Sequence, residues 1–255
     1  MAAVSSDESE VLDRLLEFAR ELEAKRAPQE ESRFTDIAEA DRLIESDPNA
    51  FLLGALFTQG MPAERAWAGP YLLMLRLGHL DLSRIARMDF DDLAVAFAAK
   101  PALHRFKREM ARYVQAAARR VVADYGGDAS RIWRGRPTAR ELQQRLGAFD
   151  GIGQKKAAMI TEILPRHFGV EVREPSGSDV AGDVHVRRVM YRAGLARSDD
   201  VTAVVEAARR VYPRRPGMLD LACWLIGRRW CHAVRPKHDD CLLGDVCPRV
   251  GVEGS

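Results

Sequence analysis

The most informative stretch of the sequence is LGAFDGIGQKKAAMITEILPRHFGVEVREPSGSDVAGD, from Leu146 to Asp183. It begins as the end of a helix, makes a tight Gly-Ile-Gly turn at residues 151–153, and restarts as a helix that carries Lys155 and Lys156. A helix N-terminus with exposed backbone N–H groups is a ready anion site. A lysine and a carboxylate delivered nearby would be the parts of a site for chemistry beside a phosphate backbone.

A helix, a Gly-x-Gly turn and a second helix together form a helix-hairpin-helix pattern. Gly151 and Gly153 permit positive φ, and they let a phosphate approach the backbone without a Cβ in the way. A plain αα-hairpin, in which the glycines serve packing alone, explains the pattern equally well. The pattern therefore predicts a hairpin and leaves both interpretations open.

The two lysines after the turn receive different predictions. Lys155 lies in the first turn of the second helix, where the macrodipole disfavours a positive charge and should lower the pKa of the amine. A nucleophilic amine needs such a lowered pKa, because it must be neutral at the working pH. The alternative is a solvated or phosphate-binding lysine. Lys156 points elsewhere on the helix, and we assign it that ordinary role as a DNA contact.

Composition favours a helical protein that acts through local charge. Of 255 residues, 47% are hydrophobic and 30% charged, as in an ordinary globular protein, and aromatic residues are sparse. Net charge is only +2, so any nucleic-acid affinity must come from clustered basic residues.

No apolar run approaches the roughly 18 residues of a membrane span. The N-terminus, MAAVSSDESEV, is too acidic for a secretory signal, so we expect a cytoplasmic, nucleoid-associated protein.

Helical periodicity and capping signals recur along the chain and predict an all-α fold. Asp47-Pro48 predicts an N-cap followed by proline at the first helical position, and Thr138 with Glu141 has the spacing of a capping box. Ser198, followed by Asp199 and Asp200, is the predicted start of a later helix. The predicted helices are 7–26, 48–58, 62–77, three helices between 81 and 124 broken near 88–89 and 100–101, then 138–147, 154 onward, 183–193, 198–212 and 216–231.

Four cysteines occur, all in the C-terminal part: Cys223, Cys231, Cys241 and Cys247. In a reducing cytosol such crowding favours a metal site over disulfides. The residues after Cys231 lack apolar periodicity, so something other than a hydrophobic core must hold them.

FDGIGQKKAAM followed by GDVHVRRVMYRAGL resembles the helix-hairpin-helix (HhH-GPD) DNA glycosylase superfamily, and within it the endonuclease III family most closely. The resemblance places Lys155 on the family's Schiff-base lysine and Asp183 on its catalytic aspartate. His185 matches a histidine that we take as structural. Upstream, LLGALFTQG resembles the segment whose glutamine fills the gap left by an extruded base, which would be Gln59.

The resemblance also implies a cofactor. The family spaces four cysteines as C-x6-C-x2-C-x5-C around a [4Fe–4S] cluster, and here the same frame reads Cys231, His238, Cys241 and Cys247. Histidine replaces the second cysteine, which predicts a Cys₃His cluster of raised potential. By chemistry alone, three thiolates and an imidazole also suit zinc. Cys223 lies outside the frame and is expected to be a buried apolar residue.

The implied fold is a six-helix barrel with the hairpin (48–168) beside a discontinuous helical domain (1–47 and 169–255) that carries the cluster loop. The implied activity is base excision with AP lyase chemistry on double-stranded DNA containing a damaged pyrimidine or an abasic site, by a monomer. Arg228 and Arg229 should contact the DNA backbone. A monofunctional glycosylase, with water activated by Asp183, and a non-catalytic DNA-binding protein remain the alternatives.

Two departures from the family pattern bear on the substrate. Asp150 stands in place of the hairpin's usual proline, which should loosen the turn. The run Val170 to Gly182 is longer than the family leads us to expect and enters directly before Asp183. It either shapes the substrate pocket or lies in solvent.

Overall fold

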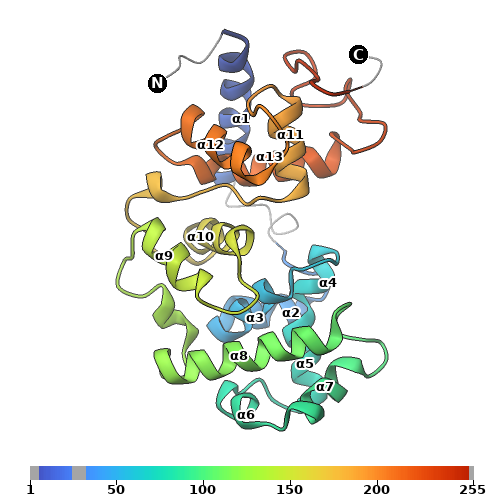
Figure 1. Cartoon of the computed structure of the whole chain (residues 1–255), viewed down its shortest axis with the longest axis vertical. Coiled ribbons are helices and arrows are strands. Elements are labelled where there is room, and N and C mark those ends of the chain that lie inside the picture. The colour runs from blue at the N-terminus through green and yellow to red at the C-terminus, as the bar shows by residue number, and fades with distance from the viewer. Residues whose placement is uncertain (1–5, 25–32, 253–255) are drawn as a thin grey trace. The chain divides into compact units, whose positions relative to one another are not determined.

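The computed structural model describes residues 6–24 and 33–252, and within these ranges the chain is helical without strands. Its helices are α1 (Ser6–Ala24), α2 (Ala38–Ser46), α3 (Pro48–Phe57), α4 (Ala63–Trp67), α5 (Gly69–Leu77), α6 (Leu82–Arg87), α7 (Phe90–Ala98), α8 (Lys107–Tyr125), α9 (Ala139–Gly147), α10 (Gln154–Phe168), α11 (Val184–Arg192), α12 (Val201–Val211) and α13 (Leu219–Arg229) (Figure 1). Short 3₁₀ turns lie at Ala129–Ile132, Pro175–Gly177 and Pro216–Met218. The predicted all-α class is confirmed.

The chain divides into two compact units. The first unit comprises the described parts of 1–28, 138–143 and 157–255, and the second those of 29–137 and 144–156. Helices α9 and α10 contribute residues to both units. The domain boundaries implied by the family resemblance, at residues 48 and 168, stay a prediction.

The second unit is built around α3. Every residue from Ala50 to Phe57 is buried, and α3 packs against α2, α4, α5 and α8. As predicted, Asp47 caps the helix: its side chain accepts a hydrogen bond from Asn49 N at 2.8 Å, and Pro48 occupies the first turn. A helix that buries every face has no stripe to orient it, so polar contacts at its ends must fix its position.

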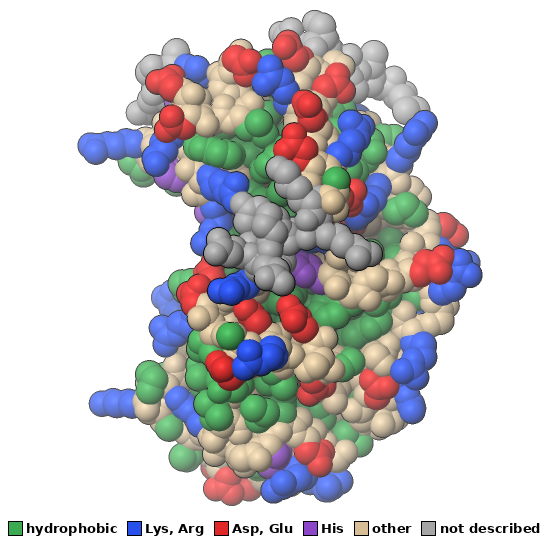
Figure 2. Space-filling view, turned by 180° about the vertical axis from the view of Figure 1, so that it is seen from behind, with side chains coloured by type: hydrophobic (Ala, Val, Ile, Leu, Met, Phe, Trp, Pro, Cys, Tyr) green, Lys and Arg blue, Asp and Glu red, His purple; other side chains and the backbone are tan. Residues whose placement is uncertain are grey.

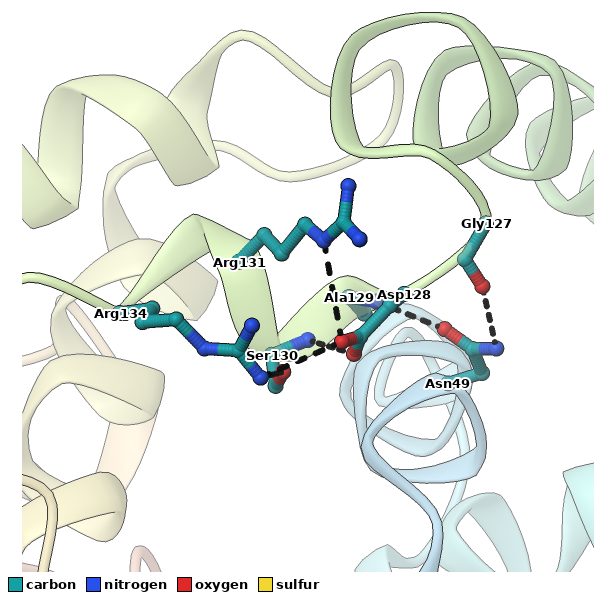
Figure 3. A network of polar contacts seen from close by, with 7 residues as sticks. All are labelled: Asn49, Gly127, Asp128, Ala129, Ser130, Arg131 and Arg134. Atoms are coloured by element: carbon teal, nitrogen blue, oxygen red, sulfur yellow. Dashed lines mark hydrogen bonds and ion pairs between the residues drawn. The ribbon is translucent and has the colours of Figure 1, made fainter.

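Asn49 supplies such a contact at the start of α3 (Figure 3). Its amide nitrogen donates to Gly127 O at 3.0 Å, and its amide oxygen accepts from Ala129 N at 2.9 Å. Asp128, between them, caps the following 3₁₀ turn by accepting from Ser130 N. The first turn of α3 is therefore tied to the loop after α8.

The first unit surrounds an apolar core contributed by the N-terminal helix and the C-terminal helices. Helix α13 packs against α11 and α1. The core includes Leu15, Val186, Met190 and Cys223, each of which is 0% exposed. Cys223 is fully buried, as expected for a cysteine outside the ligand frame, and burial raises its pKa.

Several helix limits were predicted correctly and others were wrong. The breaks near 88–89 and 100–101 are present, and Thr138 and Glu141 form the expected capping box with bonds of 2.8 and 3.2 Å. The helix predicted for 62–77 is two helices, because α4 ends at Trp67 and α5 begins at Gly69 with Pro70 in its first turn. Asp200, rather than Ser198, caps α12 by accepting from Ala203 N. Of the helix predicted for 7–26, residues 25 and 26 lie outside the described residues.

Candidate functional site

The hairpin turn depends on Gly151. Its φ is +82°, and a Cβ at this position would lie 2.7 Å from the ring of Tyr113 and 3.1 Å from Leu56. Only glycine combines that backbone conformation with such close packing. The φ of Gly153 is not positive; the residue is exposed, and a Cβ there would meet nothing within 4 Å. Gly153 is thus the open side of the turn, whereas Gly151 is the packed side.

The two lysines of α10 occupy opposite environments. Lys155 is exposed in the first turn of the helix. Lys156 is only 6% exposed, and its Nζ donates to Leu56 O at 2.6 Å, Gly151 O at 2.9 Å and Gln59 Oε1 at 3.2 Å. Burial, with the neighbouring charge of Lys155, lowers the pKa of Lys156 to about 8. The DNA contact predicted for Lys156 does not fit a side chain whose ammonium is directed into the protein.

Gln59 lies in a tight turn after α3. Thr58 has φ −70° and ψ 61°, and Gln59 N donates to Phe57 O at 2.6 Å, which is an inverse γ-turn. Gly60 follows with φ +67°. The Gln59 side chain is half-buried, and its amide oxygen faces Lys156.

His104, which no sequence pattern singled out, supports the same turn. It is 1% exposed; Phe106 N donates to its Nδ1 at 3.0 Å, so its Nε2 carries the proton and donates to Phe57 O at 3.1 Å. Burial lowers the pKa of His104, which is consistent with this neutral tautomer. His104 and Lys156 together satisfy the last carbonyl groups of α3, which no helix residue can reach.

Asp183 is the N-cap of α11. Its carboxylate accepts from His185 N at 2.9 Å, and its own N–H donates to Ala181 O at 2.7 Å. The residue is 9% exposed. His185 Nδ1 accepts from Arg188, whose guanidinium also donates to Cys231 O and Gly227 O. The structural role expected for His185 fits this network, which links α11 to α13 and to the start of the cysteine loop.

The run from Val170 to Gly182 is exposed at residues 173–176 and is anchored by hydrogen bonds on both sides of them. Ala139 N, in the first turn of α9, donates to Arg173 O at 2.9 Å. Asp179 receives two hydrogen bonds from Arg209 of α12, at 2.8 and 2.9 Å. Residues 178–181 are buried, and Ala181 N donates to the carboxylate of Asp220 in α13 at 2.7 Å. The last residues before Asp183 are thus held by α12 and α13.

One pocket in the first unit is lined by all four predicted metal ligands, which are Cys231, His238, Cys241 and Cys247. Arg192 of α11 reaches the Cys231 sulfur at 3.7 Å and donates to His232 O at 2.7 Å. A Cβ at Gly244 would collide with His238 O, so the loop requires glycine there. Within the described residues, no three His, Cys, Asp or Glu side chains are arranged closely enough to hold a single metal ion. The donor set nevertheless fits a cluster, because soft thiolates and an imidazole share one pocket.

The predicted backbone contacts Arg228 and Arg229 are exposed at the end of α13. Each guanidinium lies over an indole: Arg228 is 4.6 Å from the ring centre of Trp224, and Arg229 is 5.9 Å from that of Trp230. On the face drawn in Figure 2, Lys and Arg side chains are interspersed with Asp and Glu. Any basic footprint is therefore local, as the small net charge implies.

Fold and site together define an all-helical protein in which a glycine turn delivers an exposed lysine at a helix N-terminus. A model of the HhH-GPD superfamily base excision DNA repair protein matches residues 53–214, more than half of the chain, and the chain belongs to that superfamily. In the part that the structure describes, no helix is both long and apolar enough to cross a bilayer.

Curated relatives and solved structures agree with this assignment. Endonuclease III of Haemophilus influenzae is 33% identical over 109 residues, which cover 42% of this chain and 46% of that protein. Endonuclease III of Bacillus subtilis is 27% identical over 142 residues, covering 55% and 56%. The chain spans about half the length of the curated relatives it matches.

The structural likenesses concern the fold. A trapped endonuclease III–DNA covalent intermediate superposes with a TM-score of 0.60 at 18% identity, over 83% of this chain and 92% of the other. A thermostable thymine-DNA glycosylase gives a TM-score of 0.62 at 16% identity, over 94% of both chains.

Proposed function

We propose that this protein is a DNA base-excision glycosylase with associated AP lyase activity, acting on double-stranded DNA that contains a damaged base or an abasic site. The observation that carries the proposal is the contrast at the start of α10. Lys155 is exposed directly after the hairpin turn, whereas Lys156 is buried and fully hydrogen-bonded. Of the two lysines, Lys155 is the one on the surface, and the resemblance would align it with the family's Schiff-base lysine.

The hairpin and the arginines would hold the DNA. Backbone N–H groups beside Gly153, at the open side of the turn, would receive a phosphate, and the macrodipole of α10 favours that anion. Gln59 would fill the gap left by an extruded base, and Arg228 and Arg229 would contact the backbone. Binding of this kind would keep a monomer associated with the nucleoid.

In the reaction, Asp183 would stabilise the positive charge that develops on the sugar as the base departs, and would help activate the nucleophile. The Lys155 amine attacks C1′ through its nitrogen lone pair and the N-glycosidic bond breaks, so the bonding electrons leave with the base, which takes up a proton. Loss of a proton from nitrogen and ring opening give the Schiff base. Removal of a C2′ proton then expels the 3′ phosphate by β-elimination, and water hydrolyses the Schiff base to release the lysine.

The pocket at the C-terminus would hold a [4Fe–4S] cluster through Cys231, His238, Cys241 and Cys247. Bound there, the cluster would hold together a loop that lacks an apolar core of its own and would supply a redox-active centre. Arg192 would lie beside the Cys231 thiolate. Zinc is the alternative. An aerobically purified protein that contains zinc and shows no absorbance near 400 nm would exclude the cluster.

A panel of duplexes with different lesions tests the function, with base release and borohydride trapping measured for the wild type and Lys155→Ala. We expect release of oxidised pyrimidines, a covalent adduct with the wild type and no adduct with the variant. Base release without an adduct would favour a monofunctional glycosylase in which Asp183 activates water. Tight binding without base release, unaffected by Asp183→Asn, would show a non-catalytic DNA-binding protein.

A further inference from the structure

Lys156 is placed to control a second residue rather than to react. An ammonium group has three N–H donors, and three oxygen atoms lie within hydrogen-bond distance of Lys156 Nζ. Two are backbone carbonyls, Leu56 O at the end of α3 and Gly151 O in the hairpin. The third is Gln59 Oε1, the only one of the three that belongs to a side chain. Lys156 thus joins the hairpin to the turn that carries Gln59.

The backbone of Gln59 is fixed independently of Lys156. The inverse γ-turn at Thr58 is closed by the bond from Gln59 N to Phe57 O, and Thr58 Oγ1 donates to Ala55 O at 2.7 Å. His104 holds Phe57 O from the other side. The position of the Gln59 side chain therefore has a rigid base, and Lys156 determines which end of its amide faces inward.

An ammonium can only donate a hydrogen bond, so the group of Gln59 that faces Lys156 must be its oxygen. The amide nitrogen, with its two N–H donors, is the end that remains for a partner. A free glutamine can read a donor and an acceptor together on one base edge, as in bidentate pairing with adenine. With its oxygen directed at Lys156, Gln59 presents its amide nitrogen, and therefore its donors, to a partner.

We propose that Lys156 is a positioning residue that makes Gln59 a donor-only reader of the base opposite the excised nucleotide. The proposal rests on the proposed function, because it takes Gln59 as the residue that fills the gap. It predicts that recognition depends on acceptor atoms of the opposite base and ignores its donor groups.

The test uses full-length protein and duplexes with a tetrahydrofuran abasic analogue opposite one of three bases. Adenine offers both N1 as acceptor and N6–H as donor, purine keeps only the acceptor, and 1-deazaadenine keeps only the donor. For the wild type we expect adenine and purine to give the same Kd, and 1-deazaadenine to bind about fivefold more weakly, the value of one hydrogen bond. A wild type that loses affinity with purine, or that ignores 1-deazaadenine, would overturn the proposal.

Two variants change the predicted pattern in opposite ways. Lys156→Met keeps the length of the side chain and frees the Gln59 oxygen, so adenine should now bind about fivefold more tightly than purine. Gln59→Glu leaves Lys156 in place but presents no donor, so this variant should bind the adenine duplex as weakly as the 1-deazaadenine duplex. It replaces a half-buried residue and leaves the buried Lys156 unchanged. Lys107→Met, an exposed lysine in the first turn of α8, is the control and should keep the wild-type pattern.

A measurement without DNA separates this proposal from the proposed function. The side-chain amide resonances of Gln59, assigned by their loss in Gln59→Ala, should shift in Lys156→Met and stay unchanged in Lys107→Met. Unchanged resonances in Lys156→Met would refute the Lys156–Gln59 contact even if the protein is a glycosylase. A wild type that binds tetrahydrofuran duplex no better than undamaged duplex, with the resonances shifting as expected, would instead refute the proposed function and, with it, the role of Gln59 on DNA.

Discussion

The hairpin (residues 146–156) and the approach to Asp183 (residues 170–183) each deliver one candidate catalytic side chain, but they are held in different ways. The hairpin is set mostly by local backbone geometry: Gly151 adopts positive φ, and Ile152 N closes the turn on Phe149 O at 3.0 Å. The approach to Asp183 has almost no regular structure. Side chains from α12 and α13, remote in sequence, hold it in place.

The difference indicates which substitutions each region tolerates. A turn defined by its own residues can be recognised in the sequence, and it fails when those residues change. The segment 170–183 is held by Arg209 and Asp220. It should lose its fixed position when those distant residues are substituted, although its own sequence is unaltered. We therefore expect effects on chemistry to concentrate at Lys155 and Asp183, and effects on stability at the distant anchors.

The largest expected effect is at the hairpin lysine. Lys155→Ala should lower single-turnover base release on the order of 1,000-fold or more, because the nucleophile is lost. Since the side chain is exposed, the melting temperature should stay close to that of the wild type. Lys107→Ala, an exposed first-turn lysine elsewhere in the second unit, is the matched control. Equal rates for the two variants would remove Lys155 from the mechanism.

Asp183→Asn should separate chemistry from folding at the other region. Asparagine caps a helix as well as aspartate does, so the hydrogen bond to His185 N and the stability of α11 should be kept. Base release should fall by about 100-fold or more, because the negative charge is gone. Asp183→Ala should add a loss of about 1 kcal/mol in the free energy of unfolding. Full activity of Asp183→Asn would reduce Asp183 to a structural cap.

A distant anchor should affect stability next. Arg209→Ala leaves Asp179, whose side chain is 11% exposed, without its guanidinium. Because Arg209 itself is half-exposed, we expect a loss of about 1–3 kcal/mol in the free energy of unfolding by urea. Arg197→Ala is the control, since its pair with Glu206 is exposed on both sides and should contribute little. If the two variants are equally stable, residues 170–183 are not anchored by α12.

The smallest effect concerns the pH dependence of Lys156. Its pKa is about 8 in the folded protein and 10.5 in an unfolded chain. Between these values the unfolded chain binds the extra proton, so this residue makes stability rise with pH, by at most about 1.4 kcal/mol per unit. Urea unfolding at pH 7.5, 8.5 and 9.5 should show this rise in the wild type relative to Lys156→Met. A difference that stays constant with pH would contradict the lowered pKa.

Local features of the fold could be predicted from the sequence. The caps at Asp47 and Thr138 were predicted because capping side chains act on backbone groups two or three residues away. The division between α4 and α5 was missed, although Gly69-Pro70 carried the signal for a new helix start. Periodicity alone joined two helices that a proline separates.

The burial of Lys156 could not be predicted in this way. Lys155 and Lys156 are chemically identical neighbours, and the contact of Lys156 with the end of α3, 100 residues earlier in the chain, cannot be read from the local sequence. The same reason hides His104, whose partner Phe57 O lies 47 residues earlier in the chain. Such residues are defined by tertiary contacts, whereas capping and periodicity patterns are local.

Peptide mapping of a borohydride-trapped adduct on abasic-site DNA tests the central claim most directly. The contrast between an exposed and a buried lysine predicts that mass spectrometry will locate the modification on Lys155 of the wild type, with Lys156 unmodified. An adduct on Lys156, or an adduct that persists at full yield in Lys155→Ala, would contradict the assignment of the nucleophile.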